Sequence, residues 1–127
     1  IGPPTLMPAM PELLGADHVT SDFDAVLPQL DVVYMLRIQR ERLEGAPFPS
    51  LREYNLLFGL TREREKLMKP DAIVCHPGPL NRGVELDDYM ADHLERSEIL
   101  DQVYAGVLVR MASLYLLLGG TDHGVDA

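Results

Sequence analysis

Two short apolar runs, separated by helical segments, limit what this chain can fold into. Residues 31–36 read DVVYML and residues 72–75 read AIVC. Continuous apolar runs of this length, rich in β-branched residues, are typical of strands buried on both faces, which occur mainly in parallel sheets covered by helices. The sequence therefore predicts an α/β fold, a three-layer parallel sheet flanked by helices.

Helical signals occupy much of the remaining chain. Asp22, Ser50 and Thr61 are candidate N-caps, and Ser50 together with Glu53 has the spacing of a capping box. Pro70 prevents the third helix from continuing into the second strand. The expected helices cover residues 22–27, 50–59, 61–68, 86–91 and 97–118.

Both ends of the sequence suggest that part of the fold is missing. Residues 2–4 read GPP, which resembles a loop that leaves a strand, and residues 103–118 are apolar nearly all the way round a helix. We therefore expect a fold that is incomplete on its N-terminal side. In this interpretation residues 1–96 form most of the domain, residues 97–120 form a long helix that needs a partner, and residues 121–127 are a tail.

The composition excludes several classes of function. Twenty acidic residues against eleven basic ones give a net charge of −9, which argues against a nucleic acid or an anionic membrane as partner. The apolar stretch 103–118 is shorter than a membrane span and contains Arg110, so we expect a soluble, cytoplasmic protein. The single cysteine, Cys75, is interpreted as a small buried apolar residue. The scattered histidines fit no metal motif, so we expect no metal site.

Two segments follow the predicted strands directly, and both carry polar groups. Arg37-Ile38-Gln39 follows the first strand, and the turn His76-Pro77-Gly78-Pro79 follows the second. In parallel α/β sheets, ligands bind beyond the carboxyl ends of the strands. If the two strands are neighbours, the two segments border one site.

The chemistry of these segments suits a small anionic ligand. Arg37 can hold a carboxylate with two charge-assisted hydrogen bonds, Gln39 adds a neutral donor and acceptor, and Glu41 can orient the guanidinium. Carbonyl groups of the turn can accept from an ammonium or an amide, and we expect a cis peptide before Pro79. Taken alone, the same residues also fit a surface ion pair and a simple turn, and His76 fits either a general base or a donor to a backbone carbonyl.

Other charged residues have simpler interpretations. If Arg110 is buried within its apolar helix, a structural ion pair is expected. Residues 62–66, which alternate in charge, are most simply a solvated helix face.

The chain resembles the aspartate carbamoyltransferases in segments that occur in the family's order and cover nearly the whole sequence. The Arg37-x-Gln39 signature is of the aspartate type. The ornithine carbamoyltransferases instead carry a His-Cys-Leu-Pro turn, whereas here Cys75 precedes His76. The matching segments are residues 2–8, 31–42, 50–54, 76–85 and 107–112.

The resemblance implies transfer of the carbamoyl group of carbamoyl phosphate to L-aspartate, in pyrimidine biosynthesis and without a cofactor. Glu41 matches the residue that positions the arginine, His76 stands behind the substrate contacts, and residues 40–49 match a mobile loop that closes over the substrates. The implied contacts are Arg37 and Gln39 for aspartate, and Gly78 and Pro79 for carbamoyl phosphate.

The family's phosphate-binding motif Ser-Thr-Arg-Thr-Arg does not occur in this sequence, so we expect the segment alone to be inactive. The resemblance further implies that the last helix packs on a carbamoyl-phosphate domain outside the sequence. In that helix, Ala105 stands where the family tends to have Asn. Family members form trimers, some with added regulatory or dihydroorotase chains.

Two alternatives remain open at this point. The chain could be a non-catalytic binding or assembly module that docks a partner through its last helix, although docking would not require Arg37, Gln39 or the turn at residues 76–79. It could also belong to a carbamoyltransferase for another amino acid, such as ornithine.

Overall fold

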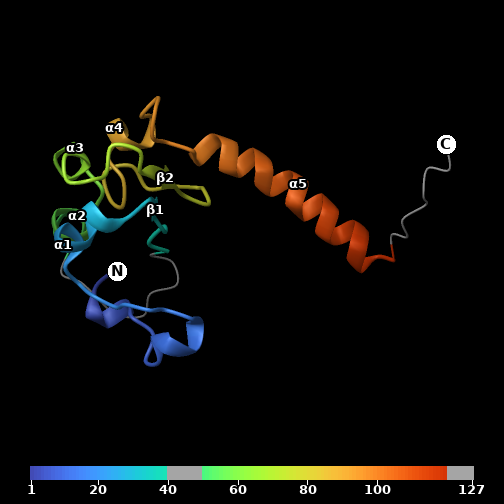
Figure 1. Cartoon of the computed structure of the whole chain (residues 1–127), viewed down its shortest axis with the longest axis horizontal. Coiled ribbons are helices and arrows are strands. Elements are labelled where there is room, and N and C mark those ends of the chain that lie inside the picture. The colour runs from blue at the N-terminus through green and yellow to red at the C-terminus, as the bar shows by residue number, and fades with distance from the viewer. Residues whose placement is uncertain (40–49, 120–127) are drawn as a thin grey trace.

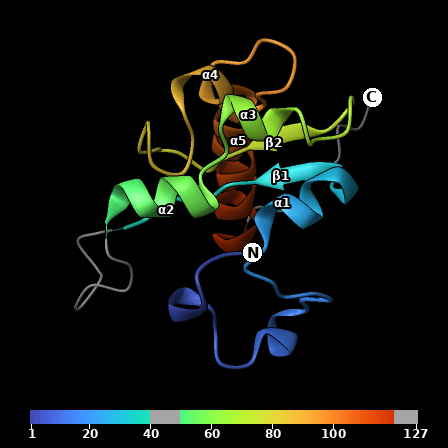
Figure 2. The same cartoon turned by 90° about the vertical axis from the view of Figure 1, so that its left-hand side faces the viewer.

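Two parallel strands, β1 (Val32–Tyr34) and β2 (Ile73–Cys75), lie at the centre of the body of the protein. The computed structural model describes residues 1–39 and 50–119. Val33 pairs with Val74, and Figure 2 shows the two strands side by side, with the helices around them. The predicted α/β fold with a parallel sheet is confirmed, and the sheet has two strands within the described ranges.

The predicted burial of the first strand on both faces is wrong. Val33 is 3 % exposed, but its neighbours Val32 and Tyr34 are 48 % and 53 % exposed. Successive side chains of a strand point to opposite faces, and no described element covers the second face of β1. The run DVVYML therefore behaves as a strand whose second face is not covered by residues 1–39 or 50–119.

One main apolar core holds the body together, and it is built from both strands and the short helices. Leu27, Val74, Leu86 and Met90 are completely buried in it. Ile38, Tyr54 and Phe58 form a smaller cluster beneath the segment that leaves β1, with Leu6 and Val84 packed against it. The segment Arg37-Ile38-Gln39 is thus anchored through its central residue.

The predicted N-caps are confirmed. Oxygen atoms of the Asp22, Ser50 and Thr61 side chains accept hydrogen bonds from backbone N–H groups at the starts of three helices, at 3.0, 3.1 and 3.4 Å. The helices expected over residues 22–27 and 61–68 are shorter than predicted, and each continues as a turn. The helices are α1 (Phe23–Val26), α2 (Leu51–Phe58), α3 (Arg62–Glu65), α4 (Asp88–Ala91) and α5 (Ile99–Leu117), with single 3-10 turns η1 (Pro4–Leu6), η2 (Pro11–Leu14) and η3 (Leu27–Gln29).

Arg64 corrects the interpretation of residues 62–66 as a solvated face. Its side chain is only 13 % exposed and forms an ion pair with Asp24 at 2.5 Å. Its guanidinium also donates to Gly59 O at 2.7 Å and to the carbonyl oxygens of Leu56 and Leu57, each at 3.0 Å. These carbonyls end helix α2, so the arginine satisfies acceptors that the helix itself leaves without partners.

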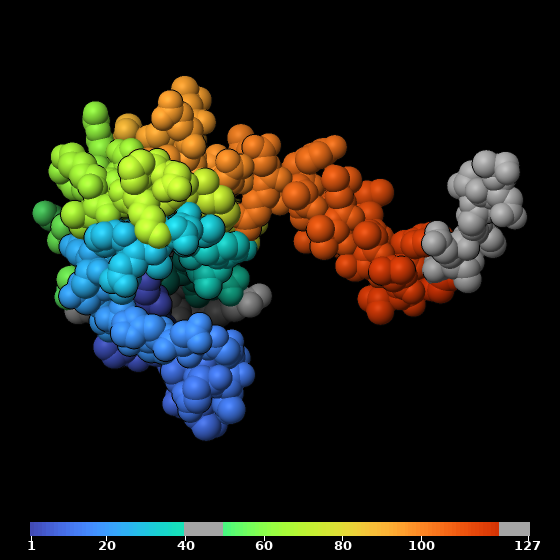
Figure 3. All heavy atoms as spheres, viewed as in Figure 1, coloured from blue at the N-terminus to red at the C-terminus, as the bar shows by residue number. Residues whose placement is uncertain are grey.

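Helix α5 projects away from the body, as Figures 1 and 3 show. Of its residues, only Ile99 is buried and only Gln102 is half-buried. Arg110 is exposed, so the condition for the expected structural ion pair is not met. The helix is long and apolar enough to cross a membrane by length and composition alone, which the estimate from residues 103–118 did not anticipate.

Candidate functional site

The segments that leave β1 and β2 start at the same edge of the sheet. Tyr34 pairs with Cys75 at the carboxyl ends of the parallel strands, and Met35 N donates to Cys75 O at 2.9 Å. Arg37 and Gln39 follow within a few residues and are half-buried. The two strands are therefore neighbours, and both segments start at the same edge, which meets the condition for one shared site.

The turn after β2 has the backbone that its sequence predicts. The Gly78–Pro79 peptide is cis, as expected. Gly78 has a φ of +61°, a region that favours glycine, and a Cβ atom added there would lie 3.4 Å from Cγ2 of Val103 in α5. Pro79 is exposed and Gly78 is half-buried, so the turn lies between the start of α5 and solvent.

His76 is completely buried behind this turn. Its Nδ1 accepts a hydrogen bond from Gly78 N at 2.9 Å, and its Nε2 has no hydrogen-bond partner among the described residues, so the expectation that it donates to a backbone carbonyl is wrong. Burial lowers the pKa of His76, the Glu85 carboxylate opposes that shift, and the charge of Arg37 adds to the lowering. His76 is therefore a neutral imidazole at neutral pH.

Glu85 is the second completely buried polar residue. Its Oε1 accepts from Asn81 N at 2.5 Å and lies 3.3 Å from His76 Nε2. Its Oε2 has no hydrogen-bond partner among the described residues. Burial, followed by the charge of Glu85, raises the pKa of the nearby Tyr54 to about 12. A buried carboxylate with one unsatisfied oxygen is costly to fold, which makes this residue a functional candidate.

Two side chains tie the strand ends together. Asn81 Nδ2 donates to Ile38 O at 3.1 Å, which joins the loop after β2 to the segment after β1. Gln102, near the start of α5, accepts from His76 N at 2.9 Å and donates to Tyr34 OH at 2.8 Å. Sequence reasoning missed both roles and that of Glu85. Asn81 and Glu85 lie within a segment that carries the resemblance, whereas Gln102 carried no signal beyond its polarity.

A cavity of about 400 Å³ opens beside β1. Its described lining is largely apolar, and Arg37 is the charged side chain in it. Gln39, Gly78 and Pro79 do not line this cavity, so the cavity alone does not outline the predicted site. Glu41 and the predicted mobile loop at residues 40–49 lie outside the described residues.

The remaining titratable groups have structural surroundings. Cys75 is half-buried, and burial, followed by the charge of Glu98, raises the pKa of its thiol. Within residues 1–39 and 50–119, no three His, Cys, Asp or Glu side chains are grouped so that they could hold a metal ion.

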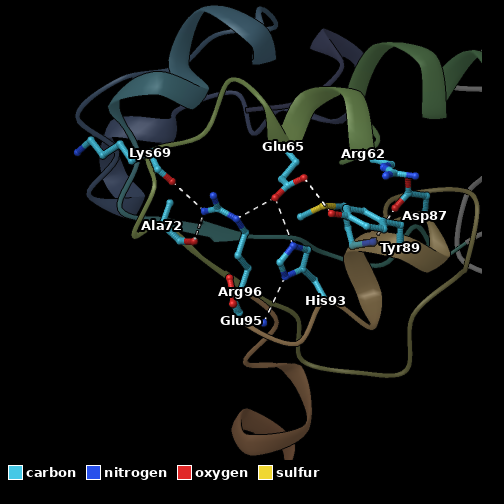
Figure 4. Close-up of polar contacts among 10 residues, drawn as sticks. Arg62, Glu65, Lys69, Ala72, Asp87, Tyr89, His93, Glu95 and Arg96 are labelled. Carbon is cyan, nitrogen blue, oxygen red and sulfur yellow. Dashed lines mark hydrogen bonds and ion pairs between the residues drawn. The ribbon is translucent and has the colours of Figure 1, made fainter.

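A second polar cluster lies away from the strand ends (Figure 4). Arg96 donates from Nε to Glu65 at 3.1 Å, and from its terminal nitrogen to the carbonyls of Lys69 and Ala72 at 2.8 and 3.0 Å. Tyr89 OH donates to the other oxygen of Glu65 at 3.2 Å. These contacts join α3, the segment before β2, and the chain between α4 and α5, and they satisfy backbone carbonyls. We therefore interpret the cluster as structural.

Comparison with known families gives a match over most of the chain. The family model described as the aspartate/ornithine carbamoyltransferase Asp/Orn binding domain matches residues 12–117. The aspartate carbamoyltransferase catalytic subunit of Rhizorhabdus wittichii is 56 % identical over 117 residues, covering 92 % of this chain and 37 % of that protein. The corresponding subunit of Sorangium cellulosum is 57 % identical over 116 residues, covering 91 % and 36 %. The chain thus spans little more than a third of the length of these relatives.

Solved structures give the same result. Aspartate transcarbamoylase from Trypanosoma cruzi in complex with carbamoyl phosphate aligns with a TM-score of 0.59 and 32 % identity, covering 72 % of this chain and 28 % of that one. The same enzyme with aspartate and phosphate aligns with a TM-score of 0.55 and 29 % identity, covering 76 % and 26 %. Ornithine carbamoyltransferase from Pyrococcus furiosus aligns with a TM-score of 0.62 and 25 % identity, covering 79 % and 31 %.

Proposed function

We propose, since this chain belongs to the aspartate/ornithine carbamoyltransferase family, that it forms the aspartate-binding part of an aspartate carbamoyltransferase. That enzyme transfers the carbamoyl group of carbamoyl phosphate to L-aspartate, as a step of pyrimidine biosynthesis. The observation that carries the proposal is that Arg37-Ile38-Gln39 and the turn at residues 76–79 leave neighbouring strands at the same edge of the parallel sheet.

The chemistry of the two segments fits the two substrates. Arg37 has the fork geometry for a substrate carboxylate, and Gln39 lies beside it with a neutral donor and acceptor. Carbonyl oxygens of Gly78 and Pro79 can accept from the NH₂ of the carbamoyl group. The aspartate amine would attack the carbamoyl carbon, lose a proton, and displace phosphate. Orientation and charge stabilisation supply this catalysis, and we expect no metal or organic cofactor.

The remaining parts of the active site are proposed to lie in the rest of the enzyme. The relatives are about two and a half times as long as this chain, and α5 exposes an apolar surface over most of its length. We infer that α5, including Ala105, packs on a carbamoyl-phosphate domain, and that the segment alone is inactive. A cytoplasmic homotrimer is the proposed assembly, to which regulatory or dihydroorotase chains can be added.

Aspartate is favoured over ornithine as the acceptor for two reasons. Arg37 offers a positive charge to a carboxylate, whereas the side chain of ornithine is a cation. Pro77, rather than a cysteine, follows His76. A purely docking role would leave the polar connections between the strand ends unexplained.

The experiment is a steady-state assay of the full-length gene product, with L-aspartate or L-ornithine as acceptor. We expect N-carbamoyl-L-aspartate from the wild type. Arg37→Ala should lower kcat/KM for aspartate by roughly 100-fold or more, because a charged pair is lost. Arg62→Ala is the matched control, since Arg62 is exposed on α3 and stacks on Tyr89. Turnover of ornithine only, or an unaffected Arg37→Ala variant, would overturn the proposal.

A further inference from the structure

The loop after β2 contains a buried pair of polar residues that the proposed reaction does not use directly. We propose that Glu85 is a positioning residue of this site, which holds His76 in the one tautomer that can fix the Gly78–Pro79 turn. This inference rests on the proposed function, because it assigns the turn to the carbamoyl group.

The tautomer of His76 follows from its hydrogen bonds. Gly78 N–H can only donate, so the Nδ1 atom that it meets at 2.9 Å carries no proton. In a neutral imidazole the proton then sits on Nε2. That nitrogen is buried without a hydrogen-bond partner among the described residues, and Glu85 Oε1 lies 3.3 Å from it, within ion-pair distance. A proton on Nε2 is attracted by the carboxylate oxygen at this distance, which favours the tautomer that leaves Nδ1 free to accept.

Glu85 is itself held in place from its own loop. Asn81 N donates to Oε1 at 2.5 Å, which directs this oxygen towards His76. The same asparagine donates from its side chain to Ile38 O at 3.1 Å. The carboxylate thus stands between the turn proposed to contact carbamoyl phosphate and the segment proposed to bind aspartate.

The burial of the pair argues for a role beyond stability. Both side chains are completely buried, and Oε2 of Glu85 has no partner among the described residues. An apolar residue of similar size would avoid the cost of burying that carboxylate. A carboxylate retained in such a position is explained if its oxygen is needed as an acceptor for His76.

The alternative protonation states do not fit the turn. If Nδ1 carried a proton, two donors would face each other at 2.9 Å, and the Gly78 contact would break. The same holds for the doubly protonated imidazolium. Gln102 holds the backbone of His76 at 2.9 Å but does not touch its ring, so it cannot select the tautomer.

The first test needs no substitution and no activity. In full-length wild-type protein labelled with ¹⁵N-histidine, nitrogen–proton correlation spectra at neutral pH should show His76 protonated on Nε2 alone. The signal is assigned by its loss in His76→Gln. A wild-type Nδ1–H tautomer or an imidazolium at neutral pH would overturn the inference.

The second test uses substitutions in the same full-length protein. Glu85→Ala should populate the other tautomer and lower kcat/KM for carbamoyl phosphate by roughly 10- to 100-fold, because the turn is no longer held in place. Glu85→Gln should stay within about tenfold of wild type, since an amide oxygen can still accept from Nε2–H. A Glu85→Ala variant with unchanged tautomer and kinetics would contradict the assignment, as would a Glu85→Gln variant as impaired as Glu85→Ala.

Glu65→Ala provides a matched control. Glu65 is also a carboxylate close to a histidine, with Oε1 at 3.3 Å from His93 Nε2, but it belongs to the structural cluster of Figure 4. Its loss should leave the His76 signal and the kinetics unchanged. If the wild type shows the expected tautomer but no carbamoylation of aspartate, the proposed function fails while the hydrogen-bond arrangement stands, so the two failures are distinguishable.

Discussion

The edge of the sheet and helix α5 differ in how completely the described residues pair their polar groups and bury their apolar side chains. At the sheet edge, Gln102 accepts a hydrogen bond from His76 N. Asn81 donates to Glu85 and to Ile38 O, and the residues beneath are buried. Along α5, every residue from Leu100 onwards is exposed except Gln102, which is half-buried. Most of the exposed side chains are apolar, like those in the core. The difference indicates that the described residues hold the sheet edge together, whereas they leave most of the apolar surface of the last helix exposed.

The two regions meet at the start of α5. Gln102 joins the strand ends, and Val103 lies against Gly78, before the helix leaves the body. The helix therefore contacts the candidate site through its first turns and exposes the rest of its surface. Comparing substitutions in the body and on α5 tests this division.

The largest expected difference concerns apolar truncations. Leu86 is completely buried and Leu117 is 82 % exposed. Leu86→Ala should lower the free energy of unfolding of the 127-residue chain by about 2–5 kcal/mol, because it leaves a cavity in the core. Leu117→Ala should change it by less than about 0.5 kcal/mol. Urea unfolding followed by circular dichroism measures both, and equal effects would break the comparison.

A smaller difference is expected between two arginines of α3. Arg64→Ala should destabilise the chain by about 1–3 kcal/mol, because the carbonyls at the end of α2 lose their donor and Asp24 loses its partner. Arg62→Ala should cost less than about 1 kcal/mol, since Arg62 mainly stacks on the exposed Tyr89. The same unfolding measurement applies. An Arg64→Ala variant as stable as Arg62→Ala would show that water, rather than Arg64, satisfies the carbonyl groups at the end of α2.

Stability should also depend on pH through His76. Burial lowers its pKa in the folded state below the ordinary value of 6.5, so the unfolded chain binds more protons as the pH falls through that value. Stability is therefore expected to fall with decreasing pH below about 6.5, by at most about 1.4 kcal/mol per pH unit for one proton.

The pH dependence has its own control. His76→Gln should reduce the slope of unfolding free energy against pH in this window, and His18→Gln tests an exposed histidine in the same way. Glu85 and Arg37 are the charged groups that act on His76, and they act in opposite directions. A His76→Gln slope equal to that of the wild type would contradict the assignment of the effect to this buried imidazole.

Much of the fold could be predicted because its signals are local. Asp22, Ser50 and Thr61 act as N-caps through their own side chains, and the cis peptide at Pro79 belongs to a single turn. The two strands were predictable from their apolar runs, whereas their neighbouring positions are shown only by the structure. The exposed face of β1 could not be predicted, because it depends on whether another element covers that strand.

The polar network of the site depends on tertiary contacts and was missed for that reason. Glu85 and His76 are nine residues apart, and Gln102 reaches both strand ends from α5. Arg64 was misread because its role depends on where α2 ends. Arg37, Gln39, Gly78 and Pro79 were placed at the correct edge, whereas their roles in binding remain proposals.

Hydrogen exchange tests the central claim most directly, using full-length protein with and without N-(phosphonacetyl)-L-aspartic acid, the ligand of one solved Trypanosoma cruzi structure. This account predicts slower exchange, on ligand addition, at the backbone amides of Arg37, Ile38, Gln39 and Gly78. Unchanged exchange at these amides under saturating ligand, with protection appearing elsewhere in the protein, would contradict the claim that the two strand ends form the substrate site.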